Sequence, residues 1–231
     1  MPFRGRKAIR FYRPFIKTGD LCFDIGAHVG NRMRSWLKLG AHVVALEPQP
    51  HLMNFLRRWY ADREEVVLLQ QAVGAEQGQT RMFISRLTPT VTSLSRKWIT
   101  TVREDRSFRS VNWDDELTVT VTTLDQLIEQ FGMPVFCKID VEGYEAEVLK
   151  GLSRPVPMLS FEYIPATIAI AVECIALLSR LGSYEFNWSQ GENFNLLSAS
   201  WLDANSMVEV INTTQAMWRS GDIYARLKNS G

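Results

Sequence analysis

Short apolar runs alternate along the chain with longer segments in which apolar residues recur every three or four positions. The short runs predict buried strands, and the spacing of three or four predicts amphipathic helices. Strands are expected from Leu21 and over residues 43–46, 66–69, 135–139 and 158–163. Helices are expected over residues 31–39, from Pro50, from Thr123, over 145–150 and from Ile168 to near Gly182. This alternation indicates a parallel sheet covered by helices on both faces.

The alternation breaks between Gly74 and Thr122. Residues 80–85 and 117–122 alternate polar and apolar positions, which predicts half-buried strands, so we expect an insertion of antiparallel strands over about residues 75–122. The middle of the insertion, residues 86–116, is rich in arginine and tryptophan. These residues suit either contacts with a polar, ring-shaped acceptor or a loop anchored by two aromatic side chains, and whether the loop is a substrate lid stays open.

Composition narrows the possible functions. The chain has 231 residues and is 46% hydrophobic, enough for a sizeable core, so we expect a single domain over residues 21–231. Its 26 basic and 25 acidic residues nearly balance, which disfavours nucleic acid as a partner. Residues 1–20 form a basic leader. We expect the leader to pack on the domain as a helix with solvated charges, although a phosphate-bearing substrate or an anionic surface would also suit it.

Cysteine usage and hydropathy predict a cytoplasmic protein without a membrane span. The cysteines Cys22, Cys137 and Cys174 form no C-x-x-C pair, and the first two lie in apolar runs. The longest apolar region, Ile164–Leu178, contains polar residues and is too short for a straightforward membrane helix. The sequence begins without a secretory apolar segment.

One stretch carries the clearest chemical signal. The apolar run from Leu21 ends in Asp24, and a turn with Gly26 and Gly30 leads into an amphipathic segment. Glycines there let backbone N–H groups approach a ligand beside the unpaired N–H groups of a helix start. The spacing Asp-x-Gly-x-x-x-Gly is not the Gly-x-Gly-x-x-Gly of dinucleotide-binding proteins, which favours S-adenosylmethionine. Glu47 ends the next run, where an acid can accept both ribose hydroxyls.

Polar side chains follow the other predicted strands as well. Gln71, Asp140 and Glu162 lie at or near strand ends, as do Asp24 and Glu47. In an open α/β sheet, ligands bind in the crevice beyond the carboxyl ends of the strands. We therefore expect these five side chains to share one site.

Five segments together resemble a known family. FDIGAHVGN, ALEPQP, QQAVG, TTLDQLI and KIDVEGYEAEVLKG occur in this order between about Leu21 and Leu152. Through them the sequence resembles the class I S-adenosylmethionine-dependent methyltransferases and, more narrowly, the FkbM-type methyltransferase family. The implied fold is a Rossmann-like, mostly parallel, seven-stranded, doubly wound sheet with the β insertion between its third and fourth core strands. Residues 184–188 and 222–227 would form its antiparallel C-terminal hairpin, with a short helix around 207–211.

The resemblance implies S-adenosyl-L-methionine as cofactor and S-adenosyl-L-homocysteine as product. Glu47 would hold the ribose, and Asp24 would order the glycine turn and contact the ammonium group. Many class I enzymes have an acid in place of Gln71, so this position departs from the pattern. As alternatives, Asp24 caps a turn and Glu47 is a solvent-facing strand end. The full predicted cofactor set is Asp24, Gly26, Ala27, His28, Gly30, Asn31, Glu47, Pro48, Gln71, Ala72, Val73 and Asp140.

A hydroxyl acceptor benefits from a base. Asp140, Glu142 and Glu162 are the candidates, because a carboxylate beside other acids has a raised pKa. Lys138 would orient a carboxylate or stabilise oxyanion charge. The alternative for residues 138–142 is a strand end followed by an acid at a helix N-terminus. The three histidines lack a zinc spacing, so no metal ligand is assigned, and a metal bound by Asp140 and its neighbours is neither required nor excluded.

The predicted function is therefore an S-adenosylmethionine-dependent methyltransferase acting on a hydroxyl of a sugar, a glycan or another small metabolite. The preference for oxygen and sugar comes from the resemblance alone. Alternatives are an NAD(P)-dependent oxidoreductase and a non-catalytic nucleotide-binding module on the same fold. A nucleic-acid amino-methyltransferase is disfavoured, because the chain lacks an Asn-Pro-Pro-Tyr motif and a net basic charge. A homodimer suits this type of fold, but no residue pattern points to one.

Overall fold

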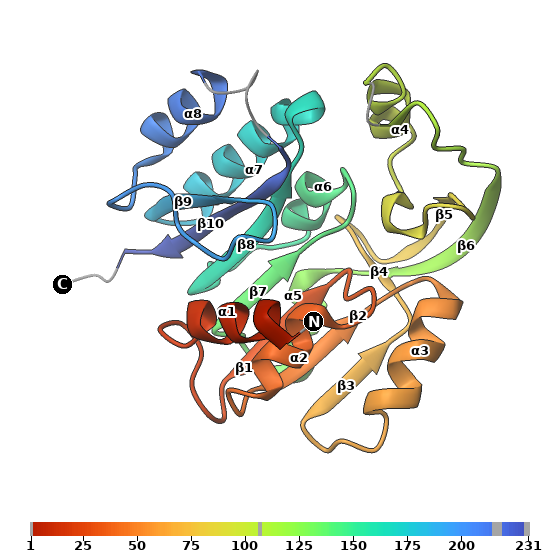
Figure 1. Cartoon of the computed structure of the whole chain (residues 1–231), viewed down its shortest axis with the longest axis horizontal. Helices are drawn as coiled ribbons and strands as arrows, with labels where there is room; N and C mark the ends of the chain where they lie inside the picture. The colour runs from red at the N-terminus through yellow and green to blue at the C-terminus, as the bar shows by residue number, and fades with distance from the viewer. Residues whose placement is uncertain (1, 106–107, 214–218, 229–231) are drawn as a thin grey trace.

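A mostly parallel sheet forms the centre of the computed structural model, which describes residues 2–105, 108–213 and 219–228. Within these ranges the sheet has seven strands in the order β3-β2-β1-β7-β8-β10-β9 (Figure 1). They are β1 (Leu21–Ile25), β2 (His42–Leu46), β3 (Val66–Leu69), β7 (Phe136–Ile139), β8 (Met158–Tyr163), β9 (Tyr184–Gln190) and β10 (Gly221–Leu227). Strand β10 runs antiparallel to both of its neighbours, and the other pairs are parallel. The predicted fold class, including the antiparallel C-terminal hairpin, is confirmed.

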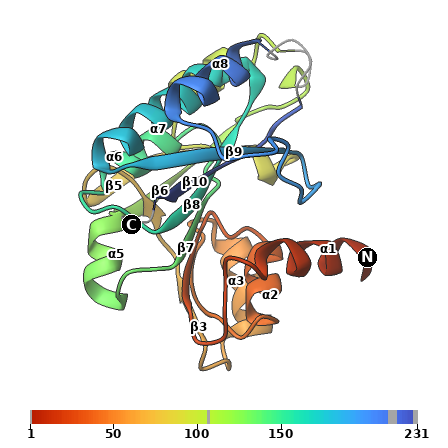
Figure 2. The ribbon, with the colours of Figure 1, turned by 90° about the vertical axis from the view of Figure 1, so that its left-hand side faces the viewer.

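Helices cover both faces of the sheet, as Figure 2 shows in a view turned by 90°. One face packs against α1 (Pro2–Tyr12), α2 (Asn31–Leu37) and α3 (Pro50–Tyr60). The other face packs against α5 (Leu124–Phe131), α6 (Glu145–Lys150), α7 (Ile168–Leu181) and α8 (Ala204–Thr213). In the described ranges no helix combines the length and apolar character needed to cross a membrane.

Double-sided burial explains why the strands are apolar throughout. Successive side chains of a strand point to opposite faces. Cys22 and Val43 belong to the core beneath α1, α2 and α3, whereas Phe23 and Val44 belong to the core beneath the other helices. Continuous apolar runs are thus what a sheet with two covered faces requires.

The insertion, which lies between β3 and β7 in the sequence, forms a second, smaller sheet. Its strands are β4 (Ala72–Val73), β5 (Gly78–Ile84) and β6 (Asp115–Thr122), in the order β4-β6-β5. Strands β5 and β6 are antiparallel as expected, whereas the short β4 pairs in parallel with β6. The loop between β5 and β6 also contains a 3-10 turn (Pro89–Val91) and a helix, α4 (Arg96–Val102), neither of which the sequence pattern indicated.

Local signals account for where helices begin and end. Helix α5 starts at the expected capping box, in which the Thr123 hydroxyl accepts from the Gln126 backbone N–H and the Gln126 side chain accepts from the Thr123 N–H. Helix α2 ends at Leu37 rather than the expected residue 39. The chain turns there because Gly40 has φ +86° and the Leu39 and Ala41 N–H groups both return to the Trp36 carbonyl.

The leader segment is joined to the core through Tyr12. This side chain is fully buried, with its ring edge-on to Trp36 at 5.6 Å and to Phe136 at 5.5 Å between centroids. The basic residues Arg6, Lys7 and Arg10 of α1 are exposed. The aromatic contacts, rather than the charges, therefore fix α1 against the sheet.

Two tryptophans on neighbouring helices offer a matched test of this packing. Trp36 is fully buried, whereas Trp59 on α3 is 63% exposed. We expect Trp36→Ala to lower the free energy of unfolding by about 3–5 kcal/mol, because it leaves a cavity among aromatic rings. Trp59→Ala should change it by no more than about 1 kcal/mol. Urea denaturation of both variants measures the difference, and equal losses would contradict the packing described.

Candidate functional site

A cavity of about 250 Å³ lies beyond the carboxyl ends of β1, β2, β7 and β8. Most residues that the sequence assigned to a cofactor or to catalysis line this cavity. They are Asp24, Gly26, Ala27, His28, Asn31, Glu47, Pro48, Gln71, Ala72, Val73, Asp140, Glu142 and Glu162. Residues from four strand ends thus converge at the place where open α/β sheets bind ligands.

Two of the predicted residues, Gly30 and Lys138, lie outside the lining. Gly30 has φ +76°, and a Cβ there would lie 2.8 Å from the Met33 Cε and 3.1 Å from a Leu56 methyl carbon. Gly30 therefore shapes the turn and packs on the core. Lys138 is fully buried beneath the cavity and acts through its neighbours, as described below.

The turn after β1, which forms part of the cavity wall, depends on Gly26. Its φ is +82°, and a Cβ would lie 1.9 Å from the Asp140 carbonyl oxygen. The Gly26 and Ala27 N–H groups both donate to the Leu46 carbonyl at 2.9 Å. Because only glycine permits this approach, the turn after β1 can touch the loop after β7 and hold both loops at one cavity.

Asp24 joins the end of β1 to helix α2. Its side chain is buried, and Oδ2 accepts from the Met33 backbone N–H at 3.2 Å, in the first turn of the helix. Gly30, at the N-cap, has no side chain to do this. Burial raises the pKa of Asp24 to about 6, against the lowering effect of Arg32 and Lys138. The capping role considered from sequence is therefore present, and the same residue also lines the cavity.

Glu47 connects two loops at the wall of the cavity. Its Oε2 accepts from the His28 N–H and its Oε1 from the Gln49 N–H, each at 2.9 Å. The side chain is 3% exposed, so it is not the solvent-facing strand end considered as an alternative. Burial raises its pKa to about 7, although the two N–H donors lower it. Each oxygen keeps a further lone pair with which to accept a ligand hydroxyl.

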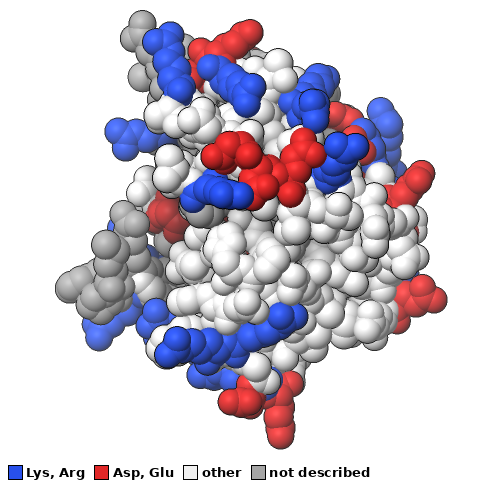
Figure 3. All heavy atoms as spheres, turned by 90° about the vertical axis from the view of Figure 1, so that its right-hand side faces the viewer, with Lys and Arg blue, Asp and Glu red and all other residues white. Residues whose placement is uncertain are grey.

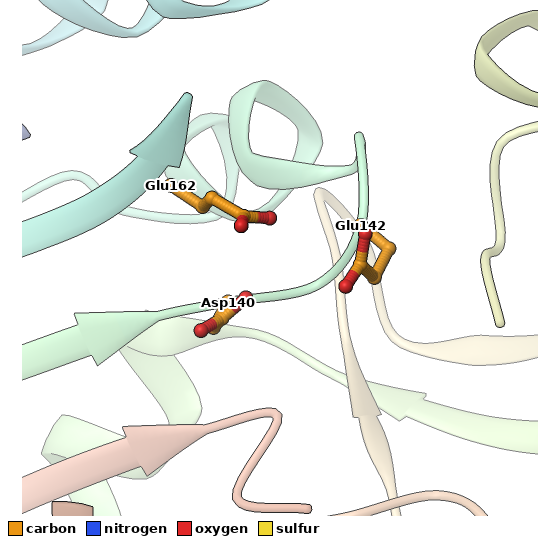
Figure 4. A group of neighbouring side chains, drawn as sticks. All are labelled: Asp140, Glu142 and Glu162. Carbon is orange, nitrogen blue, oxygen red and sulfur yellow. The ribbon is translucent and has the colours of Figure 1, made fainter. Parts of the chain in front are cut away.

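Three acids converge at the far side of the cavity. Oxygen atoms of Asp140, Glu142 and Glu162 all lie within 4.8 Å of one another. Figure 4 shows Glu162 extending from the end of β8 toward the loop that carries Asp140 and Glu142. Burial and the neighbouring carboxylates raise the pKa of Glu142 and of Glu162 well above the ordinary range. Glu142 and Glu162 therefore favour either the protonated form or a bound cation beside them.

The loop that presents these acids is held by Glu145. Its Oε1 accepts from the Val141 and Gly143 N–H groups, each at 3.2 Å. Glu142 lies between them in the left-handed region, with φ +52°. A non-glycine residue there is sterically costly and persists only when its surroundings hold it. The Ser93 hydroxyl adds a further restraint by donating to the Glu142 carbonyl at 2.6 Å.

A network of ion pairs joins the cavity lining to the buried Lys138 and Asp222, and the sequence reasoning missed three of its members: Arg32, Glu192 and Asp222. Lys138 Nζ lies 3.1 Å from Asp140 Oδ2 and 2.8 Å from Asp222 Oδ1. Arg32 pairs with Glu192 through two bonds of 2.8 Å and lies 3.7 Å from Asp222. Burial alone would lower the pKa of Lys138, but the two aspartates raise it above its ordinary value. Lys138 thus remains a cation.

The insertion supplies one wall of the cavity through Met82, Thr90, Thr92 and Leu94. Its aromatic residues pack on the protein instead. Trp98 is buried against Gly143, where a Cβ would lie 2.0 Å from the indole, and its ring contacts that of Trp113 at 6.2 Å. Of the two interpretations of this loop, anchoring by aromatic residues agrees with these contacts. Its role as a lid stays a prediction.

The outer face of the insertion carries mixed charge. Arg86 pairs with Asp115, and both Arg81 and Arg96 pair with Glu116. Figure 3 shows basic and acidic side chains beside one another on this face. Exposed pairs of this kind add little stability, and they leave the face without a continuous basic surface.

The charge of the cavity itself is strongly one-sided. Among the described lining residues the carboxylates are Asp24, Glu47, Asp140, Glu142, Glu162 and Glu192. Arg32 is the lining guanidinium, and Glu192 already pairs with it. Burial lowers the pKa of His28, so this side chain is neutral at pH 7. A positively charged ligand is therefore favoured here over an anionic one.

Comparisons with known proteins agree with the fold. Residues 24–164, more than half of the chain, match the family described as the methyltransferase FkbM domain. The hexuronic acid methyltransferase AglP of Haloferax volcanii is 24% identical over 163 residues, 68% of this chain and 61% of the relative, so the chain spans about three fifths of that protein's length. The precorrin-6y C5,15-methyltransferase of Geobacter metallireducens GS-15 shares the fold, with a TM-score of 0.50, 12% identity and coverage of 96% of this chain and 86% of that one.

The raised pKa of Glu47 predicts a pH-dependent stability. Between about pH 4.5 and 7 the folded protein holds a proton on Glu47 that the unfolded chain has released, so this carboxyl lowers the free energy of unfolding as pH rises. The slope is at most about 1.4 kcal/mol per pH unit. We expect Glu47→Gln to flatten the decline between pH 5 and 7 in urea denaturation. Glu64→Gln, at an exposed site, should keep the parental slope. A parental slope in both variants would show that Glu47 does not titrate in this range.

Proposed function

The chain belongs to the FkbM methyltransferase family, and we propose that it transfers a methyl group from S-adenosyl-L-methionine to a hydroxyl group of a sugar or glycan. The observation that carries the proposal is the carboxylate-lined cavity at the strand ends. Residues 24–164, which match the family, include the glycine turn, Glu47 and the acid cluster. Family membership supports methyl transfer, and the cavity supports the choice of cofactor.

The residues present suit a cationic cofactor. S-adenosylmethionine supplies an electrophilic methyl group on a positively charged sulfur and also carries an ammonium group. The lining contains six acidic side chains, and even with Glu142 and Glu162 protonated it attracts these charges and repels the diphosphate of NAD(P). The lining guanidinium, Arg32, is held by Glu192 and would have to leave this partner to bind a phosphate. The oxidoreductase alternative is therefore disfavoured on charge as well as on glycine spacing.

We assign the cofactor contacts by position in the cavity. Glu47 would accept the ribose hydroxyls, since both of its oxygens are already fixed by backbone N–H groups. Gly26, Ala27 and Asn31 would surround the methionine part. Gln71, Ala72 and Val73, which also line the cavity, would border the adenine. The short β4 holds the last two of these residues in place through its pairing with β6.

The acceptor would enter from the side of the acid cluster. Asp140 is the candidate base, because it lines the cavity and its side chain is 36% exposed, while Lys138 fixes one of its oxygens. Asp140 would take the hydroxyl proton while the acceptor oxygen is methylated. The bound cofactor would supply the methyl group and leave as the uncharged thioether, which keeps the electron pair of the broken carbon–sulfur bond. Alignment of the acceptor in the cavity supplies much of the rate, and the base adds about 10²–10⁴-fold.

The acceptor class rests on the relative and on the chemistry of the lining. AglP acts on a hexuronic acid, which is a hydroxyl-rich sugar. The lining beside the acid cluster includes Thr90 and Thr92, whose hydroxyl groups suit a polar acceptor. A sugar hydroxyl is therefore our first choice, and another small hydroxylated metabolite is the second.

Calorimetry tests the cofactor assignment directly. We expect the protein to bind S-adenosylmethionine and S-adenosylhomocysteine but not NAD. Glu47→Ala should weaken both sulfur ligands at least tenfold, since two hydroxyl contacts to a buried carboxylate are lost. The exposed control Glu64→Ala should bind as the parent does. Binding of NAD without either sulfur ligand would end the methyltransferase proposal, and unchanged affinity in Glu47→Ala would remove Glu47 from the site.

A second experiment tests the base. Asp140→Asn keeps the shape of the side chain but cannot accept the proton, so we expect kcat for methyl transfer to fall about 10²-fold or more. The dissociation constant for S-adenosylmethionine should stay within about threefold. Asp62→Asn, on the exposed surface, is the control. Methyl transfer at the parental rate in Asp140→Asn would reassign the role of base.

A further inference from the structure

The acid cluster has the features of a cation site in addition to those of a base. We infer that Asp140, Glu142 and Glu162 together bind one divalent cation of the magnesium and manganese class, and that this cation holds the acceptor hydroxyl. The second half of the inference rests on the proposed function. The first half, cation binding, stands on the geometry of this chain alone.

The spacing of the three side chains suits a single ion. One oxygen from each residue lies within 4.8 Å of the other two. Oxygens on opposite sides of one ion lie about 4–5 Å apart, twice the metal–oxygen distances of Mg²⁺ and Ca²⁺. The ligands come from two different strand ends, with Asp140 and Glu142 in the loop after β7 and Glu162 at the end of β8 (Figure 4). Small side-chain rotations therefore suffice to surround an ion.

Glu162 provides an independent indication of a ligand. Its Oε2 is buried and has no hydrogen-bond partner among the described residues. The side chain extends toward the loop that carries the other two acids (Figure 4). A buried carboxylate oxygen without a donor costs free energy, so native proteins normally pair it with a donor, a proton or a metal.

Lys138 is not the missing partner of Glu162 Oε2. Lys138 Nζ is engaged by Asp140 Oδ2, Asp222 Oδ1 and the Ile139 carbonyl. Within the described residues neither Glu142 nor Glu162 forms a salt bridge with a basic side chain. Three carboxylates with oxygens within 4.8 Å of one another repel, and one divalent ion neutralises the two that lack a basic partner.

The donor set selects the type of ion. All three donors are carboxylate oxygens, which suit the hard cations Mg²⁺, Mn²⁺ and Ca²⁺ rather than zinc or copper. Three protein ligands leave further coordination positions of a six-coordinate ion open toward the cavity. Neighbouring hydroxyls of a sugar fit such positions, and coordination lowers the pKa of a bound hydroxyl. Its proton then passes to a carboxylate of the cluster, with no change in oxidation state.

Manganese provides the probe for this site. Addition of the 231-residue chain to Mn²⁺ should remove the electron paramagnetic resonance signal of the free ion, and excess Mg²⁺ should restore it. Glu162→Gln and Glu142→Gln should each weaken Mn²⁺ binding at least tenfold. The matched control is Glu209→Gln on the exposed face of α8. It should bind Mn²⁺ as the parent does, and thermal unfolding confirms that each variant is folded.

The outcomes separate the cation site from the proposed function. A folded parent that leaves the Mn²⁺ signal unchanged, with or without S-adenosylhomocysteine, overturns the cation site even if calorimetry shows the cofactor bound. Glutamine variants that bind Mn²⁺ as tightly as the parent also overturn it. Mn²⁺ binding lost in both variants supports the site, including in a protein that binds no S-adenosylmethionine. In that last case the role in methyl transfer fails while the cation site stands.

Discussion

The ion pair of Lys138 with Asp140 and Asp222 is the constraint on which the site depends. A fully buried ammonium group needs anionic partners, and here they come from the loop after β7 and from the antiparallel strand β10. Removing one partner of such a group typically costs about 3–5 kcal/mol, because the remaining charge is left buried. Asp140 is therefore held at one position, against the Gly26 turn on one side and the acid cluster on the other. The chemistry proposed for the cavity begins from this fixed carboxylate.

Charge connects this arrangement to function. The strand ends bring Asp24, Glu47, Asp140 and Glu162 to one cavity, where burial raises the pKa of the first two and of Glu162. A site that concentrates carboxylates out of water is unfavourable for the protein alone. A sulfonium cofactor and a divalent cation would each relieve part of that cost. The family supports methyl transfer, and the carboxylates give a physical reason for a cationic cofactor.

The sequence predicted the sheet well, because strands buried on both faces are continuous apolar runs that end at polar residues. It also placed Asp24 and Glu47 at the ends of two such runs, and both side chains line the cavity. It placed Lys138 in the site, although this side chain lies below the cavity, because a strand pattern does not show which face a lysine occupies. Arg32 and Asp222 were missed because their pairing joins residues 190 positions apart. The pattern of residues along the sequence does not show which distant residues come into contact.

The most direct test of the central claim is a crystal structure of the chain grown with S-adenosylhomocysteine. We expect the ribose hydroxyls to lie within hydrogen-bond distance of the Glu47 carboxylate and the adenosyl group to lie against the turn at Gly26. Density for the nucleoside elsewhere on the protein, or a Gly26 turn blocked by packed side chains in the presence of the ligand, would contradict it.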